Sequence, residues 1–143
     1  ALNAQGIVTA LPINGSWRGW GNNTSCYPDN KDPKDRWISV RRMFNWQGNT
    51  FIKTYFDKVD DNTNYKLIES IVDAENIRGN SLVAQGLVAG MKLEFKEAEN
   101  PIANILDGKI KFHQKFSPYT PAEYIENVLE FDPTLVQNAL TGG

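Results

Sequence analysis

The chain has 143 residues, of which 41% are hydrophobic and 22% are charged, and its formal net charge at pH 7 is -2. This composition excludes a disordered or low-complexity chain and suits one domain with one hydrophobic core. The net negative charge argues against nucleic acid as a partner, and no apolar run reaches the roughly 20 residues of a transmembrane segment.

The charges are unevenly divided along the chain. Residues 1–58 carry eight Lys or Arg against four Asp or Glu, whereas residues 59–143 carry seven against thirteen. This asymmetry is expected either to be satisfied by internal pairing or to guide contact with a protein partner. We expect a single domain over 1–143, with an N-terminal extension over 1–12 and a long polar loop over 21–35.

Polar turns separate segments of about seven to eleven residues, a spacing typical of an antiparallel meander. Strands are predicted to begin at about residues 15, 36, 50, 65, 81, 91, 109 and 123. In "RWISVRRMFNW", alternation places Val40, Arg42, Phe44 and Trp46 on one face. The segments "MKLEFK" and "KIKFHQKF" alternate regularly and predict half-buried strands.

Two later segments fit both a helix and a strand. Residues 65–77 fit a helix through Leu67 and Ile71 and a strand through Ile68 and Val72, and the flanking turns favour the strand.

Residues 121–131 follow a capping-box pattern, Thr120 with Glu123, which predicts a helix, yet Ile125 and Leu129 belong to an alternation that fits a last strand. A short C-terminal helix is predicted over 133–141.

Eight strands predict a mainly β fold, an antiparallel up-and-down meander that closes into a barrel or cup with a short C-terminal helix. The alternative is an α+β fold with a curved antiparallel sheet. The triplet Gly15-Ser16-Trp17 resembles the Gly-x-Trp signature of the first strand in lipocalins, members of the calycin superfamily. The resemblance implies a lipocalin-like barrel in which Trp17 is a structural plug across the closed end.

A barrel of this size holds one small ligand, which makes the inward side chains candidate ligand contacts. Arg42 would project into the interior, where its charge needs a partner, either a ligand carboxylate or Glu69 or Asp73 on a neighbouring strand. The predicted ligand-binding residues are Arg42, Phe44, Trp46, Tyr55, Phe95, Phe112 and Gln114.

Few residues suggest catalysis or metal binding. The single cysteine, Cys26, rules out an internal disulfide, and His113 falls on the polar face of its segment. We therefore expect no metal site and no cofactor, and the catalytic residues, if the chain is an enzyme, are unknown. The start at Ala1 rather than Met would suit export or an organelle lumen after removal of a targeting peptide.

Three hypotheses follow for function. The leading one is a barrel that binds a hydrophobic or amphipathic small molecule. The second is an accessory or structural subunit of a larger protein assembly, with the charge asymmetry and the loop over 21–35 as contacts. The third is a cofactor-free isomerase, cyclase or lyase, which would need an inward acid such as Asp57 or Glu69.

Overall fold

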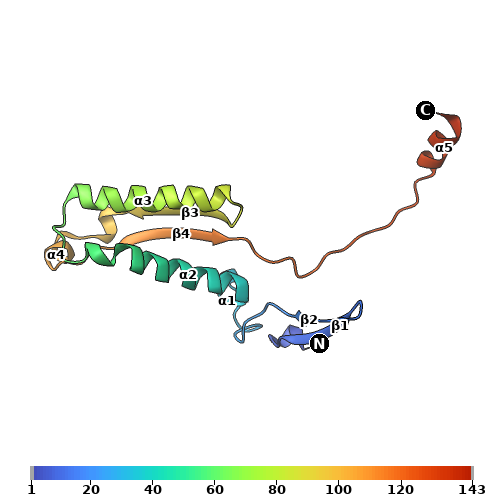
Figure 1. Cartoon of the computed structure of the whole chain (residues 1–143), viewed down its shortest axis with the longest axis horizontal. Coiled ribbons are helices and arrows are strands. Elements are labelled where there is room, and N and C mark those ends of the chain that lie inside the picture. The colour runs from blue at the N-terminus through green and yellow to red at the C-terminus, as the bar shows by residue number, and fades with distance from the viewer. Residues whose placement is uncertain (1, 143) are drawn as a thin grey trace.

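The computed structural model describes residues 2–142 and has an α+β architecture (Figure 1). The α-helices are α1 (Pro33–Arg36), α2 (Ile38–Tyr55), α3 (Tyr65–Ala84), α4 (Ile102–Leu106) and α5 (Pro133–Thr141). The strands are β1 (Thr9–Ile13), β2 (Ser16–Trp20), β3 (Val88–Phe95) and β4 (Phe112–Pro118). Short 3-10 turns occupy Asn3–Gln5, Phe56–Lys58 and Glu97–Glu99.

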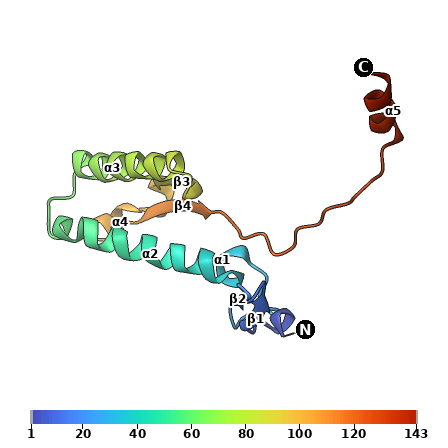
Figure 2. The same cartoon turned by 45° about the vertical axis from the view of Figure 1, so that its right-hand side comes forward.

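The predicted eight-stranded barrel is wrong. Over residues 2–142 the strands form two separate two-stranded antiparallel sheets, β1 with β2 and β3 with β4, and neither closes on itself. Trp17 lies on β2, where its side chain is 75% exposed, so there is no barrel end for it to plug. The β1–β2 hairpin lies beside the chain's other N-terminal segments, away from the β3–β4 sheet (Figure 2).

Helices occupy the positions of four predicted strands, and the sequence pattern concealed them because polar residues stand in the middle of their buried faces. In α2, Val40 and Gln47 are buried at helical spacing, and in α3 the buried set is Ile71, Glu75, Gly79 and Leu82. Buried Gln47 and Glu75 interrupt the apolar period of 3.6 residues from which an amphipathic helix is recognised.

The main core lies between the β3–β4 hairpin and the helices α2 and α3. Its buried members are Leu82, Val88, Met91 and Phe116, with Met43 and Phe44 packed against them. Met91 and Phe116 are direct cross-strand neighbours, and Phe44 meets the ring of Phe116 edge to face at 5.2 Å between centroids. The other face of the hairpin carries charged side chains, so this sheet has one buried and one solvated face.

Gly79 lets α3 approach β3 closely. A Cβ atom at this position would lie 3.0 Å from both the carbonyl oxygen and the Cγ of Met91. A Cβ atom on Gly48, in α2, would have no neighbouring atom within 4 Å. The two helical glycines therefore differ in the room available for a methyl group.

We expect Gly79→Ala to destabilise the fold by about 1 to 2 kcal/mol, because β3 must move to admit the methyl group. Gly48→Ala should stabilise it by about 0.5 to 1 kcal/mol through helix propensity. The free energy of unfolding of both variants can be measured by urea titration. Equal effects of the same sign would contradict the tight contact at Gly79.

Candidate functional site

The segment after β4 is an extended arm, residues 119–132, that leads away from the body and ends in α5 (Figures 1 and 2). Its large apolar side chains, and those of α5, face solvent. They are Tyr119, Tyr124, Ile125, Val128, Leu129, Phe131, Leu135, Val136 and Leu140, with Leu129 89% exposed. So many exposed large apolar side chains within one segment mark an interaction site, because a monomer gains nothing by exposing them.

The root of the arm is fixed to the N-terminal part of the chain at Glu123. Arg36 forms an ion pair with the Glu123 carboxylate, and Asn23 donates to its other oxygen at 3.3 Å. Asn23 is buried and also accepts from Arg36 Nε at 3.0 Å. The guanidinium stacks on the rings of Tyr27 and Trp37, at 4.5 and 4.1 Å from their centroids. We call Asn23, Arg36 and Glu123 the arm latch.

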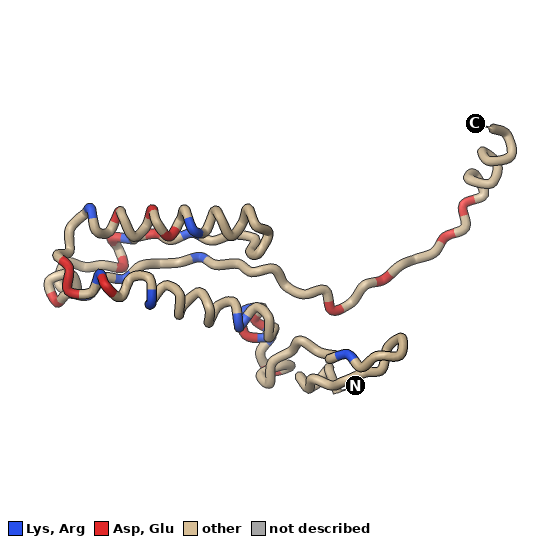
Figure 3. The backbone as a smooth tube through the Cα atoms, viewed as in Figure 1, with Lys and Arg blue, Asp and Glu red and all other residues tan. Residues whose placement is uncertain are grey.

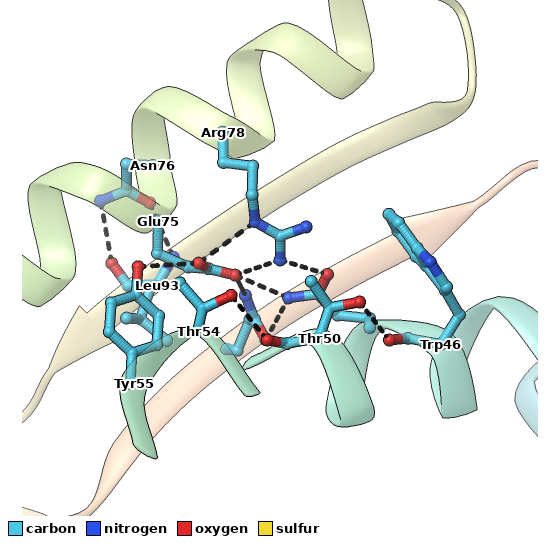
Figure 4. A network of polar contacts seen from close by, with 10 residues as sticks. Trp46, Thr50, Thr54, Tyr55, Glu75, Asn76, Arg78 and Leu93 are labelled. Carbon is cyan, nitrogen blue, oxygen red and sulfur yellow. Dashed lines mark hydrogen bonds and ion pairs between the residues drawn. The ribbon is translucent and has the colours of Figure 1, made fainter. Parts of the chain in front are cut away.

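The outer edge of β3 is sealed by a side chain of α3. Asn76 accepts from the Leu93 N–H at 2.8 Å and donates to the Leu93 carbonyl at 3.1 Å (Figure 4). The amide thus occupies the outward N–H and carbonyl of Leu93, which a further strand would need at the middle of this edge. In an antiparallel pair, two residues directly opposite each other direct their backbone groups either both inward or both outward. Leu93 directs its N–H and carbonyl outward, so its partner Gln114 directs its own N–H and carbonyl away from β3.

The outer edge of β4 is open. The outward backbone groups belong to Phe112, Gln114 and Phe116, every second residue of the strand. Within residues 2–142, no backbone or side-chain hydrogen bond reaches these groups. The hairpin therefore offers one free edge to an added strand.

A groove runs beside this open edge, between β4 and α2. Its apolar lining comes from Phe51 and Ile52 of α2 and from Ile110 and Phe112 of the β4 segment, and its volume is about 440 Å³. Ile52 is 62% exposed, so the groove is not filled by the chain itself. A strand added to β4 would direct every second side chain toward this groove.

A buried polar network holds β4 against the helices (Figure 4). The Glu75 side chain is fully buried and accepts from Gln47 at 2.7 Å, Gln114 at 3.2 Å and the Tyr55 hydroxyl at 3.0 Å. Arg78 pairs with the same carboxylate and donates to Gln47 Oε1 at 2.6 Å. The network ties α2, α3 and β4 together, and so fixes where the open edge lies.

The electrostatics of the network follow from this geometry. Burial alone raises the pKa of Glu75, but hydrogen bonds from Arg78, Gln47 and Tyr55 outweigh it and hold the pKa below its ordinary value. Burial, with the adjacent carboxylate, raises the pKa of Tyr55 to about 12. Glu75 is therefore an anion and Tyr55 a neutral donor at neutral pH.

The residues predicted to line a ligand pocket are placed as follows. Tyr55 and Gln114 meet at Glu75, and Phe95 and Phe112 are cross-strand neighbours with ring centroids 6.1 Å apart.

The remaining predicted contacts lie on α2. Phe44 packs at the core, Trp46 is 44% exposed beneath the Arg78 guanidinium, and Arg42 is exposed. Glu69 and Asp73, offered as partners for Arg42, are exposed on α3. The structure thus brings the predicted residues together in pairs and does not arrange all of them around one cavity.

Other chemistry has little support in the described part of the chain. Cys26, Asp57 and Glu69 are exposed. No group of three or more His, Cys, Asp or Glu side chains among residues 2–142 is arranged to hold a metal ion. None of the helices described there is both long and apolar enough to cross a bilayer.

Sequence reasoning missed the residues that matter most for the edge and the arm. Glu75, Gln47 and Asn76 were hidden because they sit inside segments interpreted as strands. The signal that could have found the first two is their spacing: Gln47 is seven residues after Val40, and Glu75 four after Ile71, which places each on a helical face.

Comparison with known proteins gives related sequences in phage tails, although no protein-family model matches the chain. The tail sheath protein of Burkholderia phage BcepMu is 32% identical over 127 residues, which cover 85% of this chain and 26% of that protein. The major tail sheath protein of Serratia phage KSP20 is 26% identical over 132 residues, covering 91% of this chain and 32% of that protein. The tail sheath protein of Escherichia phage P2 is 26% identical over 122 residues, covering 85% of this chain and 30% of that protein. The chain thus spans about a quarter to a third of the length of these relatives.

Two solved structures share the fold. One is a chain of the anti-feeding prophage baseplate, with a TM-score of 0.80 and 22% identity over 92% of this chain and 38% of that chain. The other is a chain of the contracted PVC sheath complex from an extracellular contractile injection system, with a TM-score of 0.76 and 22% identity over 94% and 38%. The lipocalin resemblance is therefore wrong, and so is the small-molecule barrel that it implied.

Proposed function

We propose that this chain is a structural subunit that assembles with further copies into a contractile sheath, using its C-terminal arm as the linking element. The similarity to tail sheath proteins supports this second hypothesis over the small-molecule hypothesis. The observation that carries it is the arm itself, whose apolar side chains face solvent from Tyr124 to Leu140.

The open edge of β4 is the complementary surface. An extended segment recognises a free strand edge through backbone hydrogen bonds, and its alternate side chains enter pockets beside the sheet. The arm is already extended, and the groove between α2 and β4 accepts apolar side chains. One copy of the chain therefore holds both a donor segment and an acceptor edge.

Sedimentation velocity of the full chain over a wide concentration range tests the proposal. We expect concentration-dependent oligomers. The triple variant Ile125→Ser, Leu129→Ser, Phe131→Ser should associate at least about a hundredfold more weakly, because it loses three apolar side chains that assembly buries.

The matched control is Ile77→Ser, Ile102→Ser, Leu106→Ser, which removes three apolar side chains that are 70%, 76% and 82% exposed on α3 and α4. This control should associate as the unmodified chain does. A chain that stays monomeric at every concentration would refute the proposal. An equal loss of association in the two triple variants would show that the arm has no specific role in assembly.

A further inference from the structure

The arm latch contains a carboxylate site that is built without help from the arm. The Arg36 guanidinium stacks on the rings of Tyr27 and Trp37, at 4.5 and 4.1 Å from their centroids. Its Nε also donates to the buried Asn23 side chain at 3.0 Å. None of these contacts involves Glu123, so the guanidinium and the amide keep their positions when that carboxylate leaves. They then present a cation and an N–H donor to any other carboxylate that arrives.

A pocket of about 260 Å³ lies beside this carboxylate site. Part of its N-terminal wall is formed by Gly19, Trp20 and Trp37. From the arm, it is lined by Pro121 and Ala122. These two arm side chains are small, so a larger apolar side chain would make contacts with the indoles that Ala122 does not make. We call the pocket and the carboxylate site together the root site.

The arm repeats the sequence pattern that the root site holds. The triplet that occupies the site has two apolar residues followed by a glutamate, Pro121-Ala122-Glu123. The next triplet along the chain has the same pattern, Tyr124-Ile125-Glu126. Its two apolar side chains are larger, and they are 78% and 85% exposed. Figure 3 shows acidic positions spaced along the arm, and no Lys or Arg occurs over residues 119–132.

We propose that the root site binds either of these two triplets, so that the arm moves between two positions three residues apart. In the first position Glu123 pairs with Arg36, as it does in the structure. In the second position Glu126 takes the place of Glu123, while Tyr124 and Ile125 fill the pocket. This inference goes beyond the proposed function, because both positions are reached within one copy of the chain.

The segment between β4 and the root site can take up the added residues. Within residues 2–142, no backbone hydrogen bond holds residues 119–131. The backbone is therefore free to make the half rotation that a shift by three residues requires in an extended chain. The entropic cost of the longer connection rises only slowly with its length. The exchange replaces one ion pair by an equivalent one, and it buries two apolar side chains that face water in the first position.

The position of the arm sets its free length. In the first position residues 124–132 lie between the root site and α5, whereas in the second only residues 127–132 do. Three extended residues span roughly 10 Å, so the shift draws α5 toward the body by about that distance. In an assembly linked by arms, the two positions give links of two lengths.

Crosslinking within the full chain tests the exchange. In a Cys26→Ser background, Gly19→Cys places a thiol in the pocket wall, where an added Cβ meets no atom within 4 Å. Combined with Ala122→Cys it reports the first position, and combined with Ile125→Cys it reports the second. A short bismaleimide, added at high dilution, should give an intrachain crosslink in both pairs, read by mass spectrometry. The monomer is measured, so the result stands apart from whether the chain oligomerises.

The carboxylates distinguish an exchange from an arm that is merely flexible. In the pair with Ile125→Cys, Glu126→Gln should slow crosslinking about tenfold, because the second position loses its ion pair. Glu123→Gln should speed it, because the first position is weakened. The matched control, Glu130→Gln, removes a carboxylate farther along the arm and should leave the rate unchanged. Equal effects of Glu126→Gln and Glu130→Gln would overturn the proposal.

The pocket gives a second, independent readout. Pro121→Tyr with Ala122→Ile gives the first triplet the apolar side chains of the second. It should therefore hold the arm in the first position and slow crosslinking at Ile125→Cys about tenfold. The control, Asn127→Ile, adds an apolar side chain outside both triplets and should not change the rate. An unchanged rate in the double variant would overturn the proposal, because the pocket would then have no part in selecting the triplet.

Discussion

Replacement of Arg78 by methionine is expected to destabilise the fold by about 3 kcal/mol at pH 7, because it leaves the buried Glu75 carboxylate without its cation. Methionine keeps the apolar stem beside Trp46, so the change isolates the guanidinium. The matched control is Arg42→Met, an exposed arginine on α2, which should change stability by less than about 0.5 kcal/mol. Urea unfolding of both variants measures the difference.

The pH dependence of this loss has a definite sign. In the unmodified chain the pKa of Glu75 lies below its unfolded value of about 4.3, so the carboxylate stabilises the fold above that pH and the contribution is lost as the pH falls. Without Arg78, the pKa of Glu75 loses the strongest of the contacts that lower it and rises relative to the unmodified chain, so the variant gains relative stability when the acid is protonated. The loss of unfolding free energy caused by Arg78→Met should therefore be smaller at pH 4 than at pH 7. A deficit that grows on acidification would contradict the ionised state of Glu75.

Asn76→Ala is the second change with a large expected effect. It should cost about 2 kcal/mol, because the Leu93 N–H and carbonyl lose their partner at a partly buried edge. It should also open the β3 edge to unintended strand pairing, visible as increased aggregation in light scattering. Asn45→Ala, on the exposed face of α2, is the control and should have neither effect. A soluble Asn76 variant of unchanged stability would show that the amide does not seal the edge.

The sequence was informative where neighbouring side chains decide the structure. The alternation of Met91 and Leu93 with charged residues predicts a strand, and β3 lies there with those two side chains buried. The same rule fails in α2 and α3, because Gln47 and Glu75 are buried through a network whose members come from three elements. Such long-range pairing puts polar residues at buried helical positions, so their helical spacing is hidden from a search for apolar periodicity.

The arm shows a different limit of sequence reasoning. Alternation around Ile125 and Leu129 predicts a strand, yet the segment is extended without a partner inside residues 2–142. The prediction of a barrel assumed that every strand pairs within its own chain. A strand whose partner belongs to another molecule has the same alternating sequence as a strand that pairs within its own chain.

A chain that donates one arm and receives another uses two different surfaces for the same contact. Such a contact is heterologous and cannot satisfy both partners within a two-fold dimer unless the arms are exchanged reciprocally. Repeated in one direction, it closes into a ring when the rotation between neighbours divides a full turn, and otherwise it continues as a helix. In an assembly of that kind, the direction in which the arm leaves the body at Glu123 would help to set the angle between neighbouring copies, and a small rotation there would accumulate over many subunits into a change of length and diameter.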